Sequence, residues 1–272
     1  MKLIWGKLFA LIGVLIALVM NPQSVSGREL IKIPPGSYQS AYRNEGDPVQ
    51  VQVDGFLMDA LPVTNDQFFN FVKDDQRWRR SARNDLLADS HYLSHWKGDL
   101  DPAGPNHYLD SPVTNVSWFA AVEYCRSRGK RLPTINEWEY AASAGLTTLE
   151  GSGELGFNQY VLEWYSRPAP PVLPAVGNSA RNFFGIGDMH GLIWEWVLDF
   201  NSILVSGESR GDGGLERELF CGAGAIRSAN VNDYPAFMRF GLRSSLQARY
   251  TVNNLGFRCA ADLLGSGINE ND

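Results

Sequence analysis

The sequence predicts one α+β domain that is irregular and rich in loops. Its 272 residues include 27 glycines and 14 prolines, which divide the chain into short pieces. Long helices and a regular alternation of strand, helix and strand are both absent from the pattern, which favours an α+β arrangement. Hydrophobic residues make up 44% of the chain, and its 8 Trp, 14 Phe and 10 Tyr allow it to bury a sizeable core.

Two strands open the domain. The stretch 31–37 starts as a strand and runs through Pro34, Pro35 and Gly36 into a turn. Residues 51–58 then resume the alternation of apolar and polar positions that is typical of a strand. We expect the two stretches to pair as a hairpin.

The first helix is predicted just after this hairpin. Thr64 or Asn65 can cap it, because the short polar side chain of either residue can accept a hydrogen bond from a free backbone N–H of the first turn. Phe68, Phe71 and Val72 fall on one face at helical spacing. The helix is therefore expected to be short and amphipathic.

Two further helices are marked by their ends. Ser117 caps the second helix, and Gly129 follows it as a stop signal. Thr134 and Glu137 form a capping box, in which each side chain satisfies a backbone donor next to the other. A third helix is therefore predicted to begin here and to continue to Ala142.

Loops are predicted for most of the remaining chain. Residues 78–110 and 145–187 show little periodicity, and the last third reads as short strands and turns. The domain as a whole is assigned to residues 27–261. The acidic residues 262–272 are predicted to form a disordered tail.

The first 26 residues are predicted to be a cleavable signal peptide. Lys2 and Lys7 precede an apolar stretch at residues 8–20, and small residues follow at 24–27, with cleavage expected near Ser26. The apolar stretch is about 13 residues long, whereas a membrane-spanning helix needs about 20. The protein is therefore expected to be periplasmic or secreted, with no stable membrane span after cleavage; a retained anchor is the alternative.

The charge of the chain argues against nucleic acid as a partner. Its formal net charge is −6 at pH 7. One dense basic patch interrupts this acidic background, and Trp78 lies within it. The patch consists of Arg77, Arg79, Arg80 and Arg83. A solvated loop or a local salt-bridge site is its expected role.

A zinc site in the loop 78–110 is weighed and set aside. His91 and His95 have the spacing of the two histidines in the HExxH zinc motif. Tyr92 stands where the motif has its glutamate, and a third ligand would require His107 to fold back. Ordinary loop histidines are therefore expected.

Three cysteines remain for an oxidising compartment, namely Cys125, Cys221 and Cys259. Because thiols pair in such compartments and three is an odd number, the simplest expectation is one disulfide and one leftover thiol. The count alone does not say which two residues pair.

Eight short motifs follow one another along residues 30–261. They are Pro62-Val63-Thr64-Asn65, Pro112-Val113-Thr114-Asn115-Val116-Ser117-Trp118, Tyr124-Cys125, Gly129-Lys130-Arg131-Leu132-Pro133-Thr134, Glu137-Trp138-Glu139-Tyr140, Asp188-Met189-His190-Gly191, Trp194-Glu195-Trp196 and Leu255-Gly256-Phe257-Arg258-Cys259-Ala260. Together they resemble the formylglycine-generating, sulfatase-modifying factor family. The resemblance implies a single domain with little regular secondary structure, related to the C-type lectin fold.

The resemblance also implies a disulfide and a structural calcium ion. Family members have a cystine at the positions of Cys125 and Cys259, which leaves Cys221 as a buried small hydrophobe or, alternatively, as a reactive or metal-binding thiol. The family's calcium site uses backbone carbonyls and one glutamate. The matching positions are Asp188, Gly191, Ile193 and Glu195, an all-oxygen set that suits a hard cation. The alternative is a Glu195 carboxylate satisfied by a backbone donor or an arginine.

The copper site of active family members has no counterpart in this chain. Those members bind Cu(I) through two cysteines five residues apart, because soft thiolates select that ion. Counting back from Arg243 places Asn230 and Pro235 at the two positions, and counting forward from the preceding glycines places residues near Arg227 and Asn232 there. Neither register contains a cysteine, so no copper and no formylglycine-generating activity are expected.

Three functional hypotheses follow from a retained scaffold without its copper ligands. The resemblance favours an exported accessory or maturation factor that holds an exported protein or peptide client, such as a respiratory or copper enzyme. The alternative is a periplasmic tailoring enzyme, an oxidoreductase of the kind linked to siderophore maturation, and a carbohydrate- or peptide-binding module is the third. The pocket candidates are Trp194, Cys221, Asp233, Tyr234, Arg239 and Arg243.

Overall fold

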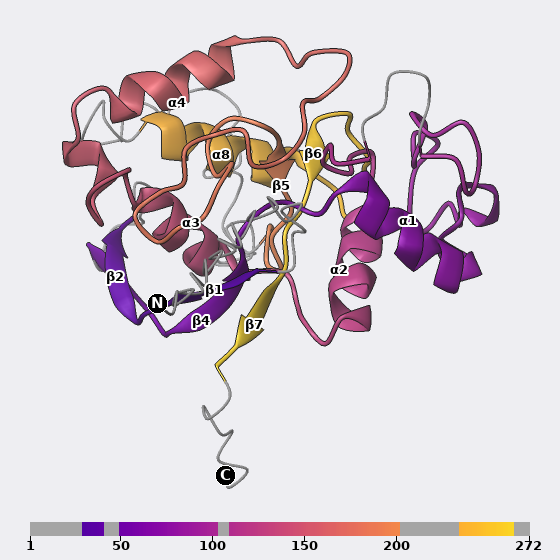
Figure 1. Ribbon diagram of the computed structural model, residues 1–272, viewed down its shortest axis with the longest axis horizontal. Coiled ribbons are helices and arrows are strands. Elements are labelled where there is room, and N and C mark those ends of the chain that lie inside the picture. The colour runs from indigo at the N-terminus through magenta and orange to yellow at the C-terminus, as the bar shows by residue number, and fades with distance from the viewer. Residues whose placement is uncertain (1–28, 41–48, 103–108, 202–233, 264–272) are drawn as a thin grey trace, which may run out of the picture.

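The computed structural model describes residues 29–40, 49–102, 109–201 and 234–263 (Figure 1). Helices and strands mix in one irregular domain, so the predicted α+β fold class is confirmed. The predicted signal peptide and two of the pocket candidates, Cys221 and Asp233, lie outside the described residues.

The predicted antiparallel pairing at the start of the domain is confirmed, but the turn predicted at Pro34, Pro35 and Gly36 is wrong, because Gly36–Gln39 continues as a strand. The pairing is divided into two antiparallel strand pairs, β1 (Leu30–Ile33) with β4 (Phe56–Asp59) and β2 (Gly36–Gln39) with β3 (Gln50–Val53). Both pairs share one continuous register from Leu30 opposite Asp59 to Gln39 opposite Gln50. The break falls at Pro34 and Pro35, because proline has no N–H to give to a ladder.

The C-terminal segment completes the sheet. Strand β7 (Ala260–Asp262) pairs antiparallel with β4, giving the order β1-β4-β7. Its last residue, Asp262, belongs to the segment predicted as tail, and its carboxylate accepts hydrogen bonds from Arg131. A second, parallel pair consists of β5 (Trp194–Glu195) and β6 (Leu255–Gly256).

All three predicted helices are present with the predicted caps. They are α1 (Asn65–Asp74), α2 (Trp118–Ser127) and α3 (Ile135–Ser143). Thr64 caps α1 and forms a capping box with Gln67, and Ser117 caps α2. The capping box of Thr134 and Glu137 opens α3. Short 3-10 turns lie at Gln76–Trp78, Arg80–Ala82 and Gly151–Gly153.

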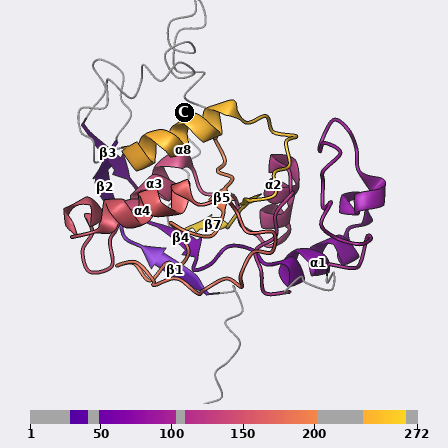
Figure 2. The same cartoon turned by 90° about the horizontal axis from the view of Figure 1, so that it is seen from above.

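Two helices lie where loops or strands were predicted. Helix α4 (Phe157–Ser166) starts at Gly156, which has a positive φ of 83° and no capping side chain, so the sequence carries no start signal there. Helix α8 (Tyr234–Ser245) has Pro235 in its first turn, where proline is tolerated, but Gly241 weakens its interior pattern. Both views place α3, α4 and α8 together at one end of the molecule, with α1 and α2 at the other (Figure 1, Figure 2).

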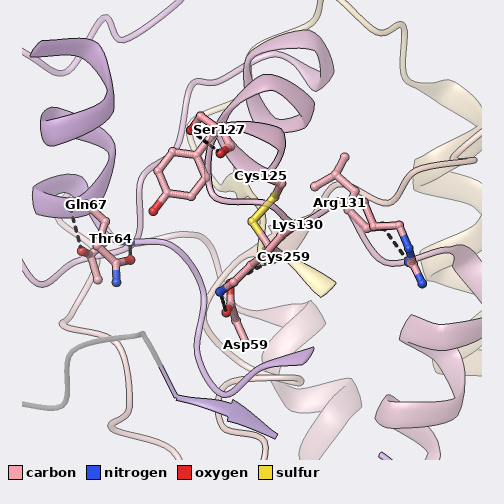
Figure 3. Close-up of a disulfide and its surroundings, with 10 residues drawn as sticks. Asp59, Thr64, Gln67, Cys125, Ser127, Lys130, Arg131 and Cys259 are labelled. Atoms are coloured by element: carbon pink, nitrogen blue, oxygen red, sulfur yellow. Dashed lines mark hydrogen bonds and ion pairs between the residues drawn. A yellow bond between two sulfur atoms is a disulfide. The ribbon is translucent and has the colours of Figure 1, made fainter. Parts of the chain in front are cut away.

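The predicted disulfide between Cys125 and Cys259 is formed (Figure 3). It joins α2 to the residue that precedes β7, across a sequence separation of 134 residues. The ammonium group of Lys130 contacts the Asp59 carboxylate beside it, and the other oxygen of Asp59 accepts from the backbone N–H of Cys259 at 3.1 Å. The link therefore ties the second helix to the three-stranded sheet.

The loop at residues 78–110 contributes to the core in its described part. Tyr92, Leu93 and Trp96 are almost fully buried. His95 lies 3.2 Å from the amide oxygen of Asn65, whereas the His91 side chain is 72% exposed, so the two rings do not converge. Among the described residues no cluster of histidine, cysteine and acidic side chains could hold a metal ion, and none of their helices is long and apolar enough to cross a membrane.

Candidate functional site

Helix α3 carries a buried carboxylate that faces two arginines of α8. Arg239 and Arg243 are four residues apart, which places both on one face of α8. Arg239 binds Glu139 through Nε at 3.0 Å and Nη2 at 2.6 Å, and Arg243 binds it through Nη1 at 2.7 Å. All three side chains are more than 90% buried. We refer to these three residues as the Glu139 cluster.

Aromatic rings surround this cluster. Both guanidinium groups lie over the Trp138 ring, with centroid distances of 5.4 Å for Arg239 and 4.7 Å for Arg243, a cation–π arrangement. Trp194 stacks on Tyr165 at 4.9 Å, and the Tyr165 hydroxyl accepts from Arg239 at 3.0 Å. Three of the predicted pocket residues, Trp194, Arg239 and Arg243, are thus brought to one place.

A second buried carboxylate, Glu195, is paired differently. Arg258 binds both of its oxygens at 2.8 Å, and Trp138 Nε1 donates to one of them at 2.8 Å. Both side chains of this Glu195 pair, Glu195 and Arg258, are fully buried. Arg258 also donates to the Gly187 carbonyl at 3.0 Å, so the guanidinium is held on both sides.

This pairing bears on the predicted calcium site. The Asp188 carboxylate turns to Gly177 and Ser179, and Glu195 is already neutralised by Arg258. Of the two carboxylates in the predicted set, Glu195 has Arg258 as its ion-pair partner, and Asp188 has no ion-pair partner among the described residues. With Glu195 paired to Arg258, the arginine alternative describes Glu195 in this structure, and the calcium site at Asp188, Gly191, Ile193 and Glu195 stays a prediction.

Two hollows border Glu195 or Glu139, and a third shares lining residues with both. The one between Trp194, Arg239 and Arg243 has a volume of about 10 Å³, enough for a single water molecule. A larger hollow of about 400 Å³, the polar cavity, is lined among others by Tyr38, Gln39, Glu139, Asn158, His190 and Arg239. A third of about 610 Å³, the apolar groove, is lined among others by Leu146, Leu155, Phe157, Tyr160, Trp164 and Leu192.

The polar cavity and the apolar groove meet at two shared side chains. Phe157 and His190 line both. His190 Nε2 lies 2.7 Å from the Ala142 carbonyl, which assigns the ring proton to Nε2, and Nδ1 has no hydrogen-bond partner among the described residues. Tyr234, another pocket candidate, is 41% exposed at the start of α8 and lines neither hollow.

The buried ionisable groups of the polar cavity have fixed charges near neutral pH. Burial opposes ionisation of Glu139, but the charges of Arg239 and Arg243 outweigh it and lower its pKa to about 2. Burial, together with the charge of Arg239, lowers the pKa of His190 to about 4. Burial also raises the pKa of Tyr38 well above its usual range. At pH 7 these groups are therefore a carboxylate, a neutral imidazole and a neutral phenol.

Several residues of this site were missed by sequence reasoning. Glu139 and His190 lie inside the quoted motifs, and their burial, which only the structure shows, is what marks them as site residues. Tyr165 belongs to α4, which has no start signal. Tyr38 lies on strand β2, and the sequence does not show which part of the protein packs against its side chain.

The fold and the site together define a class of protein. An irregular α+β domain, tied by one disulfide and built around carboxylate–arginine contacts, places the quoted motifs at its core. The family model described as "Sulfatase-modifying factor enzyme 1-like domain" matches residues 17–263. The chain belongs to this family.

Two named relatives with similar sequences agree with this assignment. The chain is 31% identical to the formylglycine-generating enzyme of Streptomyces coelicolor, over 89% of this chain and 91% of the relative. It is 29% identical to the "Inactive C-alpha-formylglycine-generating enzyme 2" of Bos taurus, over 89% of each. The solved structure of PvdO from Pseudomonas aeruginosa is also similar, with a TM-score of 0.46 and 17% identity over 86% of this chain and 94% of that one.

Proposed function

We propose that this chain is an exported accessory factor that binds an exported protein or peptide client, with a respiratory or copper enzyme as the expected client, and catalyses no reaction itself. The main support is that Glu139, His190 and Tyr38, the buried ionisable groups of the polar cavity, do not change their protonation near pH 7. General acid–base catalysis needs a group with a pKa near the working pH. Glu139, His190 and Tyr38 are far from it, so they suit binding better than proton transfer.

The shapes of the hollows support the same function. The hollow beside Trp194, where the two arginines meet the predicted pocket, has room for one water molecule and excludes a substrate. The polar cavity and the apolar groove are far larger and join at Phe157 and His190. Their volumes fall in the range of about 300–1,000 Å³ that is usual for ligand sites. A client segment with one polar and one apolar part would fill both.

Relatives of this chain differ in activity by their names. It resembles a formylglycine-generating enzyme and a protein named as inactive to nearly the same degree, 31% and 29% identity. Family membership therefore does not tell whether this chain is active. We base the proposal on the residues that could bind copper. Without two thiolates in the segment before α8, we propose that the chain holds no Cu(I).

The client is tested by site-specific photo-crosslinking in the native compartment. The photoreactive residue p-benzoylphenylalanine is placed at Asn158, which lines the polar cavity, and for comparison at Arg126 on the far helix α2. An adduct with an exported protein at position 158 and none at 126, identified by mass spectrometry, supports the proposal. No adduct, or the same adducts at both positions, would refute it.

The enzyme alternative is tested by a formylglycine assay. The purified chain is incubated with a sulfatase-type cysteine peptide, with and without added copper, and the peptide mass is measured. We expect no aldehyde product, because one cysteine in the relevant segment cannot supply two thiolates. An aldehyde product that disappears in Cys221→Ser would place a rebuilt active site at that thiol and would put the tailoring enzyme first.

A further inference from the structure

We infer that the polar cavity recognises a carboxylate group of its ligand, through the excess positive charge of the Glu139 cluster. This inference rests on the proposed function in taking the cavity as the place where the client binds. It adds the chemistry of the group that is bound there. The observations that carry it are the charge count of the cluster, its free donors and its burial.

The charge count of the cluster is unbalanced. Glu139 contributes one negative charge, and Arg239 and Arg243 contribute one positive charge each, so the sum is +1. Neither arginine has another ion pair among the described residues. Glu195, which lies nearby, is balanced by Arg258 and supplies no compensation. Among the described residues this charge has no counter-charge, which is unfavourable for a buried group, and a bound anion would relieve it.

Within the part of the chain that the structure describes, the two arginines also leave some of their donors unused. A guanidinium group has five N–H groups. Arg239 uses three of them, two for Glu139 and one for the Tyr165 hydroxyl, and Arg243 uses one, for Glu139. The other N–H groups have no hydrogen-bond partner among the described residues. Arg239 lines the polar cavity, so a ligand in the cavity can reach this residue.

The field of the cluster is felt at the neighbouring imidazole. After burial, the charge of Arg239 is the largest influence that lowers the pKa of His190, and it outweighs the opposite influence of Glu139. At Tyr38, on the other side of the cavity, Glu139 is the largest single charge influence, so the excess positive charge is felt on the His190 side. Glu150 is the acidic side chain at the exposed rim, where water screens its charge.

The geometry favours a carboxylate over a larger anion or a bare halide. The donors that remain on Arg239 are planar N–H groups, which match the two oxygens of a carboxylate. The neutral His190 and the amide and hydroxyl side chains of the cavity suit the peptide groups that flank such a carboxylate. In a peptide client, this group is either the C-terminus or an Asp or Glu side chain.

Four short peptides distinguish these sources by isothermal titration calorimetry. Acetyl-Gly-Gly-Ala with a free C-terminus is compared with its amide, and acetyl-Gly-Asp-Gly-amide with acetyl-Gly-Asn-Gly-amide. We expect one acid to bind at least about tenfold more tightly than its uncharged twin, as a charge-assisted hydrogen bond requires. The acid that shows this preference identifies the source of the carboxylate.

Charge variants show whether the preference comes from the cluster. Arg243→Gln makes the sum zero while Glu139 keeps Arg239, so the preference for the acid should disappear, and Arg243→Lys should keep it. Arg126→Gln, an equal change of net charge at an exposed position of α2, should leave it unchanged. Unfolding in urea checks that each variant is folded.

The inference is overturned if acid and amide peptides bind equally, if no peptide gives measurable heat, or if Arg243→Gln keeps the preference. These outcomes are separate from the crosslinking test of the proposed function. A client captured at position 158, with no preference for acids, would keep the accessory role and remove the carboxylate. A preference for acid peptides, with no client captured at position 158, would keep the carboxylate site and remove the accessory role.

Discussion

Two buried glutamates of this domain differ in the number of arginines that they bind. Glu195 has one arginine, Arg258, and both side chains are fully buried with their charges balanced. Glu139 has two arginines, and one side of its cluster borders the polar cavity. Trp138 contacts both regions, because its N–H donates to Glu195 and its ring lies under the two arginines of Glu139.

The difference separates a structural role from a binding role. A balanced and fully buried pair holds chain segments together and leaves nothing for a ligand to complete. An unbalanced cluster at a cavity keeps a charge and donors that a ligand can satisfy. Glutamate and arginine therefore serve two purposes in this protein. The number of arginines for each glutamate and the contact with a cavity decide between a structural and a binding role.

The largest effect is expected when the balanced pair is broken. Glu195→Ala leaves Arg258 buried without its carboxylate, and it should lower the free energy of unfolding by about 4 kcal/mol, as for other buried pairs. Urea unfolding followed by tryptophan fluorescence measures this. Glu163→Ala, which removes an exposed partner of Arg167 on α4, is the control and should lose less than about 0.5 kcal/mol. Equal losses in the two variants would contradict the structural role of the Glu195 pair.

A smaller, pH-dependent effect is expected at His190. Its pKa is about 4 in the folded protein and near 6.5 in the unfolded chain, so the unfolded chain takes up the proton first as the pH falls. Stability from this group is complete above pH 6.5 and is lost between about 6.5 and 4, with a loss of about 2 kcal/mol at pH 5. His190→Gln, which does not titrate, should remove this part of the acid sensitivity. Unfolding curves at pH 7 and pH 5 for both proteins measure it, and an unchanged difference would show that the pKa of His190 is not lowered in the folded protein.

A still smaller effect on stability is expected at the unbalanced cluster. Arg243→Gln removes the excess charge while Glu139 keeps its hydrogen bonds to Arg239, so the free energy of unfolding should change by no more than about 1 kcal/mol. The same urea assay measures it. A loss as large as that of Glu195→Ala would mean that both clusters are structural.

The smallest effect is expected from calcium. Because Arg258 already neutralises Glu195, calcium chloride or a chelator should shift the melting temperature by less than about 1 °C, since a ligand stabilises only when it binds the folded state. Differential scanning calorimetry in each solution measures this. A clear rise with calcium would show that Glu195 leaves Arg258 for the cation, as the family resemblance implied.

Much of the fold could be predicted from local signals. Thr64, Ser117 and Thr134 cap their helices as expected, because a cap and its partners lie within four residues of one another. The strand pairing was predictable for a related reason, since the two alternating stretches lie close together in the sequence. The pairing of Cys125 with Cys259 followed from the resemblance and could not be derived from three cysteines alone.

The site itself depends on tertiary structure. Glu139 and Arg239 are 100 residues apart, and Glu195 and Arg258 are 63 apart, so no local pattern tells which arginine each glutamate meets. Helices α4 and α8 have weak signals of their own. They are stabilised by contacts with each other and, for α8, by the ion pairs of its two arginines with Glu139 of α3. The sequence by itself determined the family, the capped helices and the absence of two copper-binding cysteines. The balance of charges around each glutamate was decided by the tertiary structure, because a buried charge takes its partner from whichever segment packs against it.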